Sequence, residues 1–369
     1  MAIISVKGEV MLKIGIITLT GNDNYGNKLQ HYATINCISK LKFDAETIWI
    51  TNPYKDTNVR QLARYVKRKI EDNFLYHKRR KYFLRFNKYL NIKKNLIFNN
   101  DIKKIAKLYD YLIVGSDQVW NYNYFNNDSI YLLQDCQAVN NIAFSASFGV
   151  NLIPKNHELR YKKGLNNFKY ISVRENRGKE IVEELIERKD VEVLVDPTML
   201  LTNIEWDKII HKPKQINKLH GKKYILNYFL GNLSNERKIE IEKIAKKYNC
   251  EIINILDKNC PFYESGPSEF LYLEKNAFLI CTDSFHSSVF AILYNRPFVV
   301  FDRDNSNMES MNSRIDTLLS KFKLENRRYN GINITKENLE HDYTEAYKIL
   351  EKEREKSKKF LEKALDINK

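Results

Sequence analysis

The sequence predicts an α/β fold of two Rossmann-like domains that face each other across a cleft. Its 369 residues exceed the length of a typical single core, so two domains are the default expectation. Short apolar runs alternate with segments of helical periodicity, a pattern that favours parallel sheets covered by helices. The alternation is interrupted over residues 196–222, which hold Pro197 and Pro213, and it then resumes. We therefore expect an N-terminal domain over 1–205 and a C-terminal domain over 206–369.

The first half opens with a strand, a polar loop and a helix, and further strands follow. Residues 13–20 form the first predicted strand, and the loop 21–27 leads into a helix over 28–41, where apolar residues recur at helical spacing. The remaining strands of this domain, each a short run rich in apolar residues, are predicted at 45–50, 111–114, 142–147, 170–173 and 191–195. Because helical segments intervene, the expected pairing is parallel.

The second half repeats this alternation of strands and helices. A helix is expected over 235–248. The predicted strands of this domain lie at 224–229, 251–255, 277–281 and 298–301. The tail over 336–369 is rich in Glu and Lys and carries apolar residues at intervals, so we expect a surface helix that packs across the two domains.

The composition indicates a folded protein with a strong positive charge. The 61 Lys and Arg residues against 46 Asp and Glu give a net charge of +15, which indicates anionic partners. No run of eighteen apolar residues occurs, and the first ten residues lack the apolar core of a signal peptide. The five cysteines have no C-x-x-C spacing, which argues against a disulfide framework and a zinc site. We expect a cytoplasmic protein that uses no metal or cofactor.

A basic segment over 55–107 is predicted to form a helical insert in the first domain. Between residues 60 and 88 it holds eleven Lys or Arg against two acidic residues. An apolar stripe that includes Phe83 and Phe86 lies near one helical face, so a core-facing helix with a solvated basic back is the simpler interpretation. The alternative is a surface that contacts an anionic membrane or a lipid-diphosphate substrate.

The sequence TDSFHSS at 282–288 combines a strand end, a helix start and a histidine. Ligands of open α/β sheets bind at the carboxyl ends of strands, and a helix N-terminus there favours an anion. His286 adds a group that can transfer a proton near neutral pH. The alternative is that Asp283 or Ser284 caps the helix and His286 is a hydrogen-bonded core residue.

Other loops at predicted strand ends add one further candidate for anion binding. These loops are 21–27, 115–118 and 174–175. Arg174 can hold a phosphate or carboxylate through paired donors, although an Arg at a strand end is equally often a surface salt-bridge partner. The sequence has no P-loop, dinucleotide-binding glycine motif, H-E-x-x-H or G-x-S-x-G, so the chemistries of those motifs lack their usual signals. The residues favour an anion site with one His and one Arg in a cleft.

Seven short motifs follow one another over most of residues 13–324. They are NYG-x-x-LQ-x-YA at 24–33, VGSDQVW at 114–120, SASFG at 145–149, SVRE at 172–175, VDPT at 195–198, TDSFH at 282–286 and MNSRI at 311–315. Together they resemble the polysaccharide pyruvyl transferase family. The resemblance implies a GT-B-like fold, as in glycosyltransferases with two Rossmann-like domains, which agrees with the fold expected from the strand pattern.

The resemblance also implies a reaction. The family transfers the pyruvyl group of phosphoenolpyruvate to two hydroxyls of a sugar, which gives a cyclic ketal and phosphate. His286 is the implied catalytic residue, either as the acid that protonates the methylene carbon or as a stabiliser of the departing phosphate, and Asp283 is expected to orient its ring. The implied donor-binding residues are Arg174, Ser284, Phe285, Ser287 and Arg314.

The motif at 282–288 departs from the family pattern at two positions. Some members have Arg where this chain has Ser284, and many have Gly where it has Ser287. The missing Arg removes one positive charge from the anion site. We expect Arg314 or a Lys to supply it.

The implied acceptor is a glycan of a cell-surface polysaccharide, linked to a lipid diphosphate or to a nucleotide. An aromatic ring such as Trp120 can stack on a sugar face, although an aromatic residue after a strand is also common in cores. The candidate acceptor-binding residues are Asn24, Tyr25, Gln30, Ser116, Asp117 and Trp120.

Two other functions are compatible with the sequence. A nucleotide-sugar glycosyltransferase of the same architecture would bind a nucleotide diphosphate sugar instead of phosphoenolpyruvate. A non-catalytic protein that binds RNA or an anionic membrane surface would use the basic segment. Because the motif loops lie apart from that segment, nucleic acid is not expected as a partner.

Overall fold

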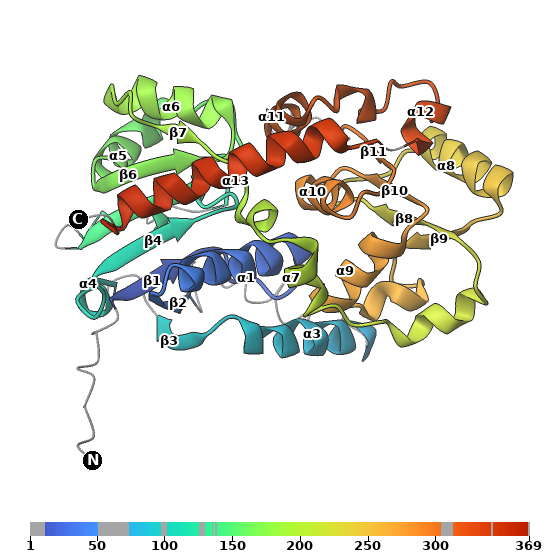
Figure 1. The fold of residues 1–369 in the computed structure, drawn as a ribbon, viewed down its shortest axis with the longest axis horizontal. Helices are drawn as coiled ribbons and strands as arrows, with labels where there is room; N and C mark the ends of the chain where they lie inside the picture. The colour runs from blue at the N-terminus through green and yellow to red at the C-terminus, as the bar shows by residue number, and fades with distance from the viewer. Residues whose placement is uncertain are drawn as a thin grey trace, which may run out of the picture.

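The prediction of two Rossmann-like domains is confirmed. In the computed structural model, the described residues form two parallel sheets of seven and four strands, each flanked by helices (Figure 1). The described residues are 12–50, 74–96, 102–124, 130–134, 136, 139–303, 313–340 and 342–367.

The N-terminal sheet has the strand order β3-β2-β1-β4-β5-β6-β7, and its strands pair in parallel. The chain starts in the middle, moves outward to β3 and returns to the other side of β1. The order therefore reverses between β1 and β4, which is where ligands bind in open α/β sheets. Its strands are β1 (Lys13–Ile17), β2 (Asp44–Ile50), β3 (Ile92–Leu96), β4 (Tyr111–Gly115), β5 (Asn140–Ala146), β6 (Phe168–Val173) and β7 (Glu192–Val193).

The C-terminal sheet has the order β11-β10-β8-β9, and its strands are also parallel. Here the order reverses between β8 and β10. The loop after β10, which contains the motif at 282–288, therefore lies at the second position suited to a ligand. Its strands are β8 (Tyr224–Tyr228), β9 (Glu251–Asn254), β10 (Leu279–Thr282) and β11 (Phe298–Val300).

The helices cover the faces of these sheets (Figure 1). Among the described helices, none is long and apolar enough to cross a membrane. Their bounds are α1 (Tyr25–Lys40), α3 (Phe74–Phe86), α4 (Ile102–Ala106), α5 (Lys155–Leu165), α6 (Asn176–Ile186), α7 (Asn203–Asp207), α8 (Asn235–Tyr248), α9 (Pro267–Asn276), α10 (Phe285–Leu293), α11 (Ser313–Phe322), α12 (Lys336–Leu339) and α13 (Thr344–Ala364).

Side-chain caps fix where several helices begin and end. Asn24 starts α1, and its side chain accepts a hydrogen bond from the Asn27 N–H. Thr202 and Glu205 form a reciprocal capping box at α7. Asn249 ends α8 in the left-handed conformation, which Asn tolerates better than most residues. The helix over 235–248 was expected at these bounds.

The basic segment over 55–107 is only partly helical. Residues 51–73 lie outside the described part of the chain. The helix α3 buries Phe83 and Phe86 as the core-facing interpretation expects, but it also buries the basic residue Arg79. Residues 92–96 form the strand β3 beside β2, so the expectation of a helical insert is wrong there. This short polar strand has no apolar alternation, which is why its sequence did not indicate it.

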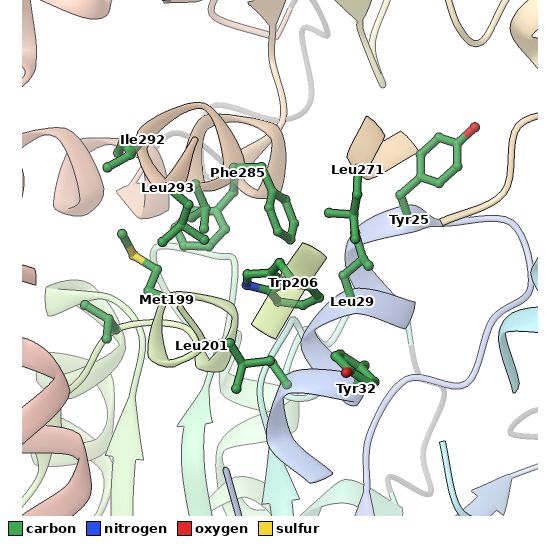
Figure 2. Packing of buried hydrophobic residues seen from close by; sticks show 14 of the residues in the cluster. Tyr25, Leu29, Tyr32, Met199, Leu201, Trp206, Leu271, Phe285, Ile292 and Leu293 are labelled. Carbon is green, nitrogen blue, oxygen red and sulfur yellow. The ribbon is translucent and has the colours of Figure 1, made fainter. Parts of the chain in front are cut away.

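The two domains share one hydrophobic core. Trp206 in α7 is fully buried, and its ring centroid lies 5.4 Å from that of Tyr32 in α1 and 5.0 Å from that of Phe290 in α10. Its Nε1 donates to the Thr198 carbonyl at 3.1 Å. Figure 2 shows Trp206 between residues of the first domain and residues of α9 and α10. Apolar contact therefore runs without a break from one domain to the other.

A second contact between the domains is centred on Tyr25. Its ring stacks on Phe270 of α9 with centroids 4.3 Å apart, and its hydroxyl donates to the Ser265 carbonyl at 2.9 Å. Arg79 of α3 donates to the same hydroxyl at 2.6 Å and to the Tyr263 carbonyl at 3.1 Å. Burial raises the pKa of Tyr25 to about 12, although Arg79 lowers it in part. The phenol is therefore neutral and serves as a packed hydrogen-bonding residue.

The C-terminal helix α13 crosses both domains, as expected from the tail (Figure 1). At its start, the Tyr347 hydroxyl donates to the Leu293 carbonyl at the end of α10. Further along, Phe360 stacks on Phe144 of β5 with centroids 6.2 Å apart. Beyond its end, the Leu365 carbonyl accepts a hydrogen bond from a tyrosine of β4 at 3.3 Å. The helix thus joins the second domain to the sheet of the first.

A lysine of the first helix, α1, is buried. Lys28 of α1 is 1% exposed, donates to Asn87 Oδ1 at 2.6 Å and lies 4.4 Å from the centroid of the Trp49 ring. Burial lowers the pKa of Lys28 to about 7, although Asp23 opposes the shift. Near neutral pH this side chain is therefore protonated in only part of the molecules.

Replacing Trp206 by Ala should lower the free energy of unfolding by about 3–5 kcal/mol, because the change leaves a cavity between the domains. Urea unfolding followed by circular dichroism measures this. Ile204→Ala on the same helix is the control, since Ile204 is 75% exposed and its loss should change stability by less than about 0.5 kcal/mol. Equal losses in the two variants would contradict the shared core.

The buried Lys28 should make stability rise with pH. Its folded pKa of about 7 lies below its ordinary value of 10.5, so above pH 7 the unfolded chain binds a proton that the folded chain does not. Between pH 7 and 9, the free energy of unfolding of the natural protein should rise relative to Lys28→Met by about 1 kcal/mol per pH unit. Lys246→Met, at an exposed position of α8, should keep the natural slope. Parallel slopes for Lys28→Met and the natural protein would refute the assignment.

Candidate functional site

The helix α10 begins at the carboxyl end of β10 without a side-chain cap. Ser284 is its N-cap residue, and the Ser284 side chain makes no capping hydrogen bond. The Ser284 N–H itself donates to Thr282 Oγ1 at 3.0 Å. The first N–H groups of an uncapped helix have no partner within the helix, so this N-terminus is suited to an anion.

His286 lies in the first turn of α10 and enters the interface between the domains. The residue is 6% exposed, and a Cβ atom on Gly26 of α1 would lie 2.2 Å from its Nδ1. The backbone of α1 can approach the imidazole this closely only because residue 26 is glycine. On the other side of the ring, Nε2 lies 3.6 Å from Asp196 Oδ2 and has no hydrogen-bond partner. Nε2 therefore faces the Asp196 carboxylate and makes no hydrogen bond within the described residues.

Asp196 is the centre of a buried polar cluster. Its Oδ2 accepts hydrogen bonds from Arg174 Nη1 and Ser116 Oγ, each at 2.6 Å. Its Oδ1 accepts from the Thr198 N–H at 2.9 Å and the Thr198 hydroxyl at 2.7 Å. Burial alone would raise the pKa of Asp196, but His286, Arg174 and Ser116 outweigh it and hold the pKa well below its usual range. Asp196 is therefore a carboxylate at neutral pH.

Arg174 follows β6 and is 3% exposed. Its Nη2 lies 3.5 Å from Asp117 Oδ1, and its Cζ lies 4.3 Å from the centroid of the Phe285 ring. Burial opposes the charge of Arg174, but Asp196 and Asp117 outweigh it and raise the pKa of the guanidinium. Nε and Nη2 are buried without hydrogen-bond partners. Arg174 is thus held by a hydrogen bond to Asp196 and a longer ion pair with Asp117, while its Nε and Nη2 retain unused hydrogen-bonding capacity.

Arg314, in the first turn of α11, is a second buried cation near Arg174. The residue is 6% exposed, its Nε has no hydrogen-bond partner, and no carboxylate in the described part of the chain forms an ion pair with it. Burial and the charge of Arg174 lower the pKa of Arg314 to about 10, although Asp117 and Glu175 oppose the shift. The side chain still carries its charge at neutral pH. A buried charge without a close counter-ion costs free energy, which a bound anion would offset.

The backbone is strained at the carboxyl edge of the first sheet. Asp117 and Ser145 have φ angles of 64° and 51°, in the left-handed region that residues other than glycine rarely adopt. Hydrogen bonds hold this edge in place: Glu175 Oε1 accepts from the Ser147 hydroxyl at 3.0 Å and from the Phe148 N–H at 2.8 Å. Strain of this kind is commonly found at functional sites.

A cavity of about 550 Å³ lies at the carboxyl ends of β1, β2 and β4, where the strand order reverses. We call it the N-terminal cavity. Asp117, which lies beside Arg174, forms part of its wall, so the cavity adjoins the buried cluster. Its lining residues are Leu19, Thr20, Gly21, Asn22, Asp23, Asn24, Asn27, Trp49, Ile50, Asp117, Gln118, Tyr124 and Tyr131.

Over residues 24–305 the sequence matches the family described as polysaccharide pyruvyl transferase. This range covers most of the chain and contains every residue of the buried cluster except Arg314. The chain belongs to the polysaccharide pyruvyl transferase family. A comparison with curated proteins gave no match.

The fold of this family member is similar to solved structures of low sequence identity. A putative UDP-N-acetylglucosamine 2-epimerase from Listeria monocytogenes has a TM-score of 0.53 at 12% identity, over 95% of this chain and 91% of that chain. UDP-N-acetylglucosamine 2-epimerase from Rickettsia bellii has a TM-score of 0.50 at 13% identity, over 97% and 98% of the two chains. At these identities the likeness shows the fold alone, which is of the GT-B type.

The predicted catalytic and donor-binding residues are only partly brought together. His286 and Arg174 both approach Asp196, Arg174 lies over the Phe285 ring, and Arg314 lies near Arg174. Ser287 lies apart, because its hydroxyl donates to the buried Glu274 Oε1 at 2.6 Å. This geometry therefore does not favour the expected contact between Ser287 and the donor.

The expectation that Asp283 orients the imidazole is corrected by the structure. Its Oδ1 accepts from the Leu230 N–H and its Oδ2 from the Gly231 N–H, both at 2.7 Å, and Arg303 Nε lies 3.1 Å from Oδ2. Asp283 thus fixes the loop after β8. The carboxylate beside His286 is Asp196 of the VDPT motif, for which the sequence predicts no role in the site.

The predicted acceptor-binding residues also separate into two groups. Asn24 and Asp117 line the N-terminal cavity. Trp120 is 1% exposed and packs on Phe148 and Phe168, so burial places it in the core. The remaining predicted residues are buried and bonded within the protein: Tyr25 to Ser265, Gln30 to Thr18, and Ser116 to Asp196.

Asp196→Asn should lower the free energy of unfolding by about 3 kcal/mol, because it leaves the buried Arg174 without its closest counter-charge. Asp190→Asn is the matched control: this carboxylate pairs with Arg188 on the surface, where a salt bridge contributes about 0–1 kcal/mol. Thermal and urea unfolding of both variants measure the difference. If Asp196→Asn were as stable as the control, the carboxylate would not be the centre of the cluster.

Proposed function

We propose that this protein transfers the pyruvyl group of phosphoenolpyruvate to two hydroxyls of a sugar in a cell-surface polysaccharide or its precursor. The products are a cyclic ketal and phosphate. Membership of the polysaccharide pyruvyl transferase family supports a transferase that acts on polysaccharide. The choice of donor rests on the chemistry of the buried cluster.

The observation that carries the proposal is a set of buried donors without partners. Arg174 Nε and Nη2, Arg314 Nε and His286 Nε2 all lack hydrogen-bond partners, and the uncapped N-terminus of α10 lies beside them. Phosphoenolpyruvate carries a phosphate and a carboxylate, which suit two guanidinium groups and a helix N-terminus. In this proposal, Arg314 supplies the charge that some family members have at the position of Ser284.

The proposed reaction begins with protonation of the donor. A proton added to the methylene carbon leaves an oxocarbenium-like centre at C2, and one sugar hydroxyl attacks C2. The bond from C2 to the phosphate oxygen then breaks, and the second hydroxyl attacks the same carbon. The two hydroxyl protons balance the reaction: one replaces the proton given to the methylene group, and the other leaves with phosphate.

His286 is the proposed proton donor, through Nε2. Asp196, whose pKa is held low, stays ionised 3.6 Å away and stabilises positive charge on the ring. Arg174 and Arg314 stabilise the departing phosphate. In this assignment Asp196 positions His286, while His286 acts on the substrate.

The proposed acceptor is a glycan linked to a lipid diphosphate or to a nucleotide. The proposed location is the cytoplasm. Contact with an anionic membrane face there is compatible with the net charge of +15. Structures of the same fold carry names of enzymes that act on a nucleotide sugar. A nucleotide-sugar glycosyltransferase is therefore the alternative that the experiment must distinguish.

The test measures phosphate released from phosphoenolpyruvate in the presence of a panel of lipid-linked and nucleotide-linked glycans. Release should require an acceptor. His286→Gln should lower kcat at least about 100-fold, because general acid catalysis contributes about 10²–10⁴-fold. Arg314→Ala should raise the KM for phosphoenolpyruvate about 100-fold, since it removes charged hydrogen bonds to the donor.

Arg177→Ala is the control for both variants, because Arg177 makes its ion pairs on the exposed surface of α6. It should leave kcat and KM within about twofold of the natural protein. An unchanged donor KM in Arg314→Ala would remove Arg314 from the site. Turnover of a nucleotide sugar without any use of phosphoenolpyruvate would replace this proposal with the glycosyltransferase alternative.

A further inference from the structure

The N-terminal cavity differs in charge from the rest of the protein. The chain has a net charge of +15, yet the described lining residues include Asp23 and Asp117 and no Lys or Arg. Because Asp117 is paired with Arg174, the exposed Asp23 is the lining carboxylate that disfavours phosphate and carboxylate groups. The anion site formed by Arg174 and Arg314 and this cavity therefore suit different parts of the substrates.

The other lining groups are suited to a polar, uncharged ring. Asn22, Asn24, Asn27 and Gln118 supply amides, and Asn22 Oδ1 is a buried atom without a hydrogen-bond partner. Amide and carboxylate oxygens accept hydrogen bonds from hydroxyl groups, while amide N–H groups donate to their oxygens. The cavity volume of about 550 Å³ is within the range of small-molecule sites and leaves room for a pyranose ring.

Trp49 adds an aromatic surface to this polar lining. The residue is partly buried at the end of β2, and its side chain lines the cavity. The ammonium of Lys28 lies 4.4 Å from the ring centroid and is itself held by Asn87. This contact restrains the indole, and it is a cation–π interaction in the molecules in which Lys28 is protonated. A fixed aromatic ring presents an apolar surface to the C–H groups of a sugar.

The cavity is also placed for reaction with a donor in the buried cluster. Asp117 lines the cavity and lies 3.5 Å from Arg174 Nη2. Asn24 lines it at the start of α1, and two residues later the backbone of Gly26 packs against His286. A sugar in the cavity would therefore present its hydroxyls next to the proposed proton donor.

We propose that the N-terminal cavity binds the pyruvyl-accepting sugar as an uncharged pyranose. Trp49 is the aromatic platform for this ring. Asp23 and Asp117 accept hydrogen bonds from its hydroxyls, and the charge of Asp23 disfavours acidic sugars. That this sugar is the acceptor rests on the proposed function. The binding itself can be measured without the donor.

The experiment is saturation-transfer NMR with methyl glycosides of neutral hexoses and of the corresponding uronic acids, without phosphoenolpyruvate. The natural protein should bind at least one neutral glycoside, and bind its uronate at least tenfold more weakly. Trp49→Ala should weaken neutral binding at least tenfold, while Trp49→Phe, which keeps an aromatic ring, should change it less than threefold. Asp23→Asn should reduce the difference in affinity between the neutral sugar and the uronate.

Tyr122→Ala is the matched control, because its ring stacks on His157 and is not part of the cavity lining. It should bind like the natural protein. Equal binding by Trp49→Ala and the natural protein, or equal binding of uronate and neutral sugar, would overturn the proposal. Melting temperatures of all variants identify any loss that comes from unfolding. If Trp49→Ala does not fold, the comparison of neutral sugar with uronate in the natural protein and in Asp23→Asn carries the test.

The same variants distinguish this proposal from the proposed function. Phosphate release from phosphoenolpyruvate with an unchanged acceptor KM in Trp49→Ala would overturn the cavity assignment and leave pyruvyl transfer intact. Sugar binding that is lost in Trp49→Ala, together with no use of phosphoenolpyruvate, would support the cavity assignment and overturn pyruvyl transfer.

Discussion

The carboxylate of Asp196 is the interaction on which the rest of the site depends. It lies directly after the last strand region of the first domain, accepts hydrogen bonds from Arg174 and Ser116, and lies 3.6 Å from His286 of the second domain. Three segments that are far apart in the sequence thus meet at one buried charge. Without it, Arg174 would be a buried cation with only the more distant Asp117 as a counter-ion. The ionised state of Asp196 therefore organises both the anion site and the interface.

The interface between the domains gives this site a fixed geometry. Trp206 packs on residues of both domains, Tyr25 stacks on Phe270, and α13 contacts both sheets. A large rotation of one domain against the other would expose this shared apolar core, which costs free energy. The positions of His286 and the two arginines are therefore set before any substrate binds. Preorganised charges of this kind lower a barrier without reorganisation during the reaction.

The sequence predicted most of the fold but only part of the site. Strands and helices with strong apolar periodicity were found, whereas the polar strand β3 was expected to be helical. His286 and Arg174 could be predicted, because a motif at a strand end needs no tertiary information. The role of Asp196 could not be predicted, because the VDPT motif is also typical of a turn at a domain boundary. Burial decides whether an aromatic residue lines a cavity or belongs to the core. Only the folded chain distinguishes Trp49, which lines the N-terminal cavity, from the buried Trp120.

The path of α13 affects the order in which this chain can fold during synthesis. The helix is synthesised after the whole C-terminal sheet, yet Phe360 stacks on Phe144 of β5 in the first sheet. Until then, an apolar face of the N-terminal domain stays open to water. Domains commonly fold one after another as they emerge, but here the first domain is completed only after the second has been made. Loss of α13 would therefore damage the N-terminal domain, from which the whole C-terminal sheet separates it in the sequence.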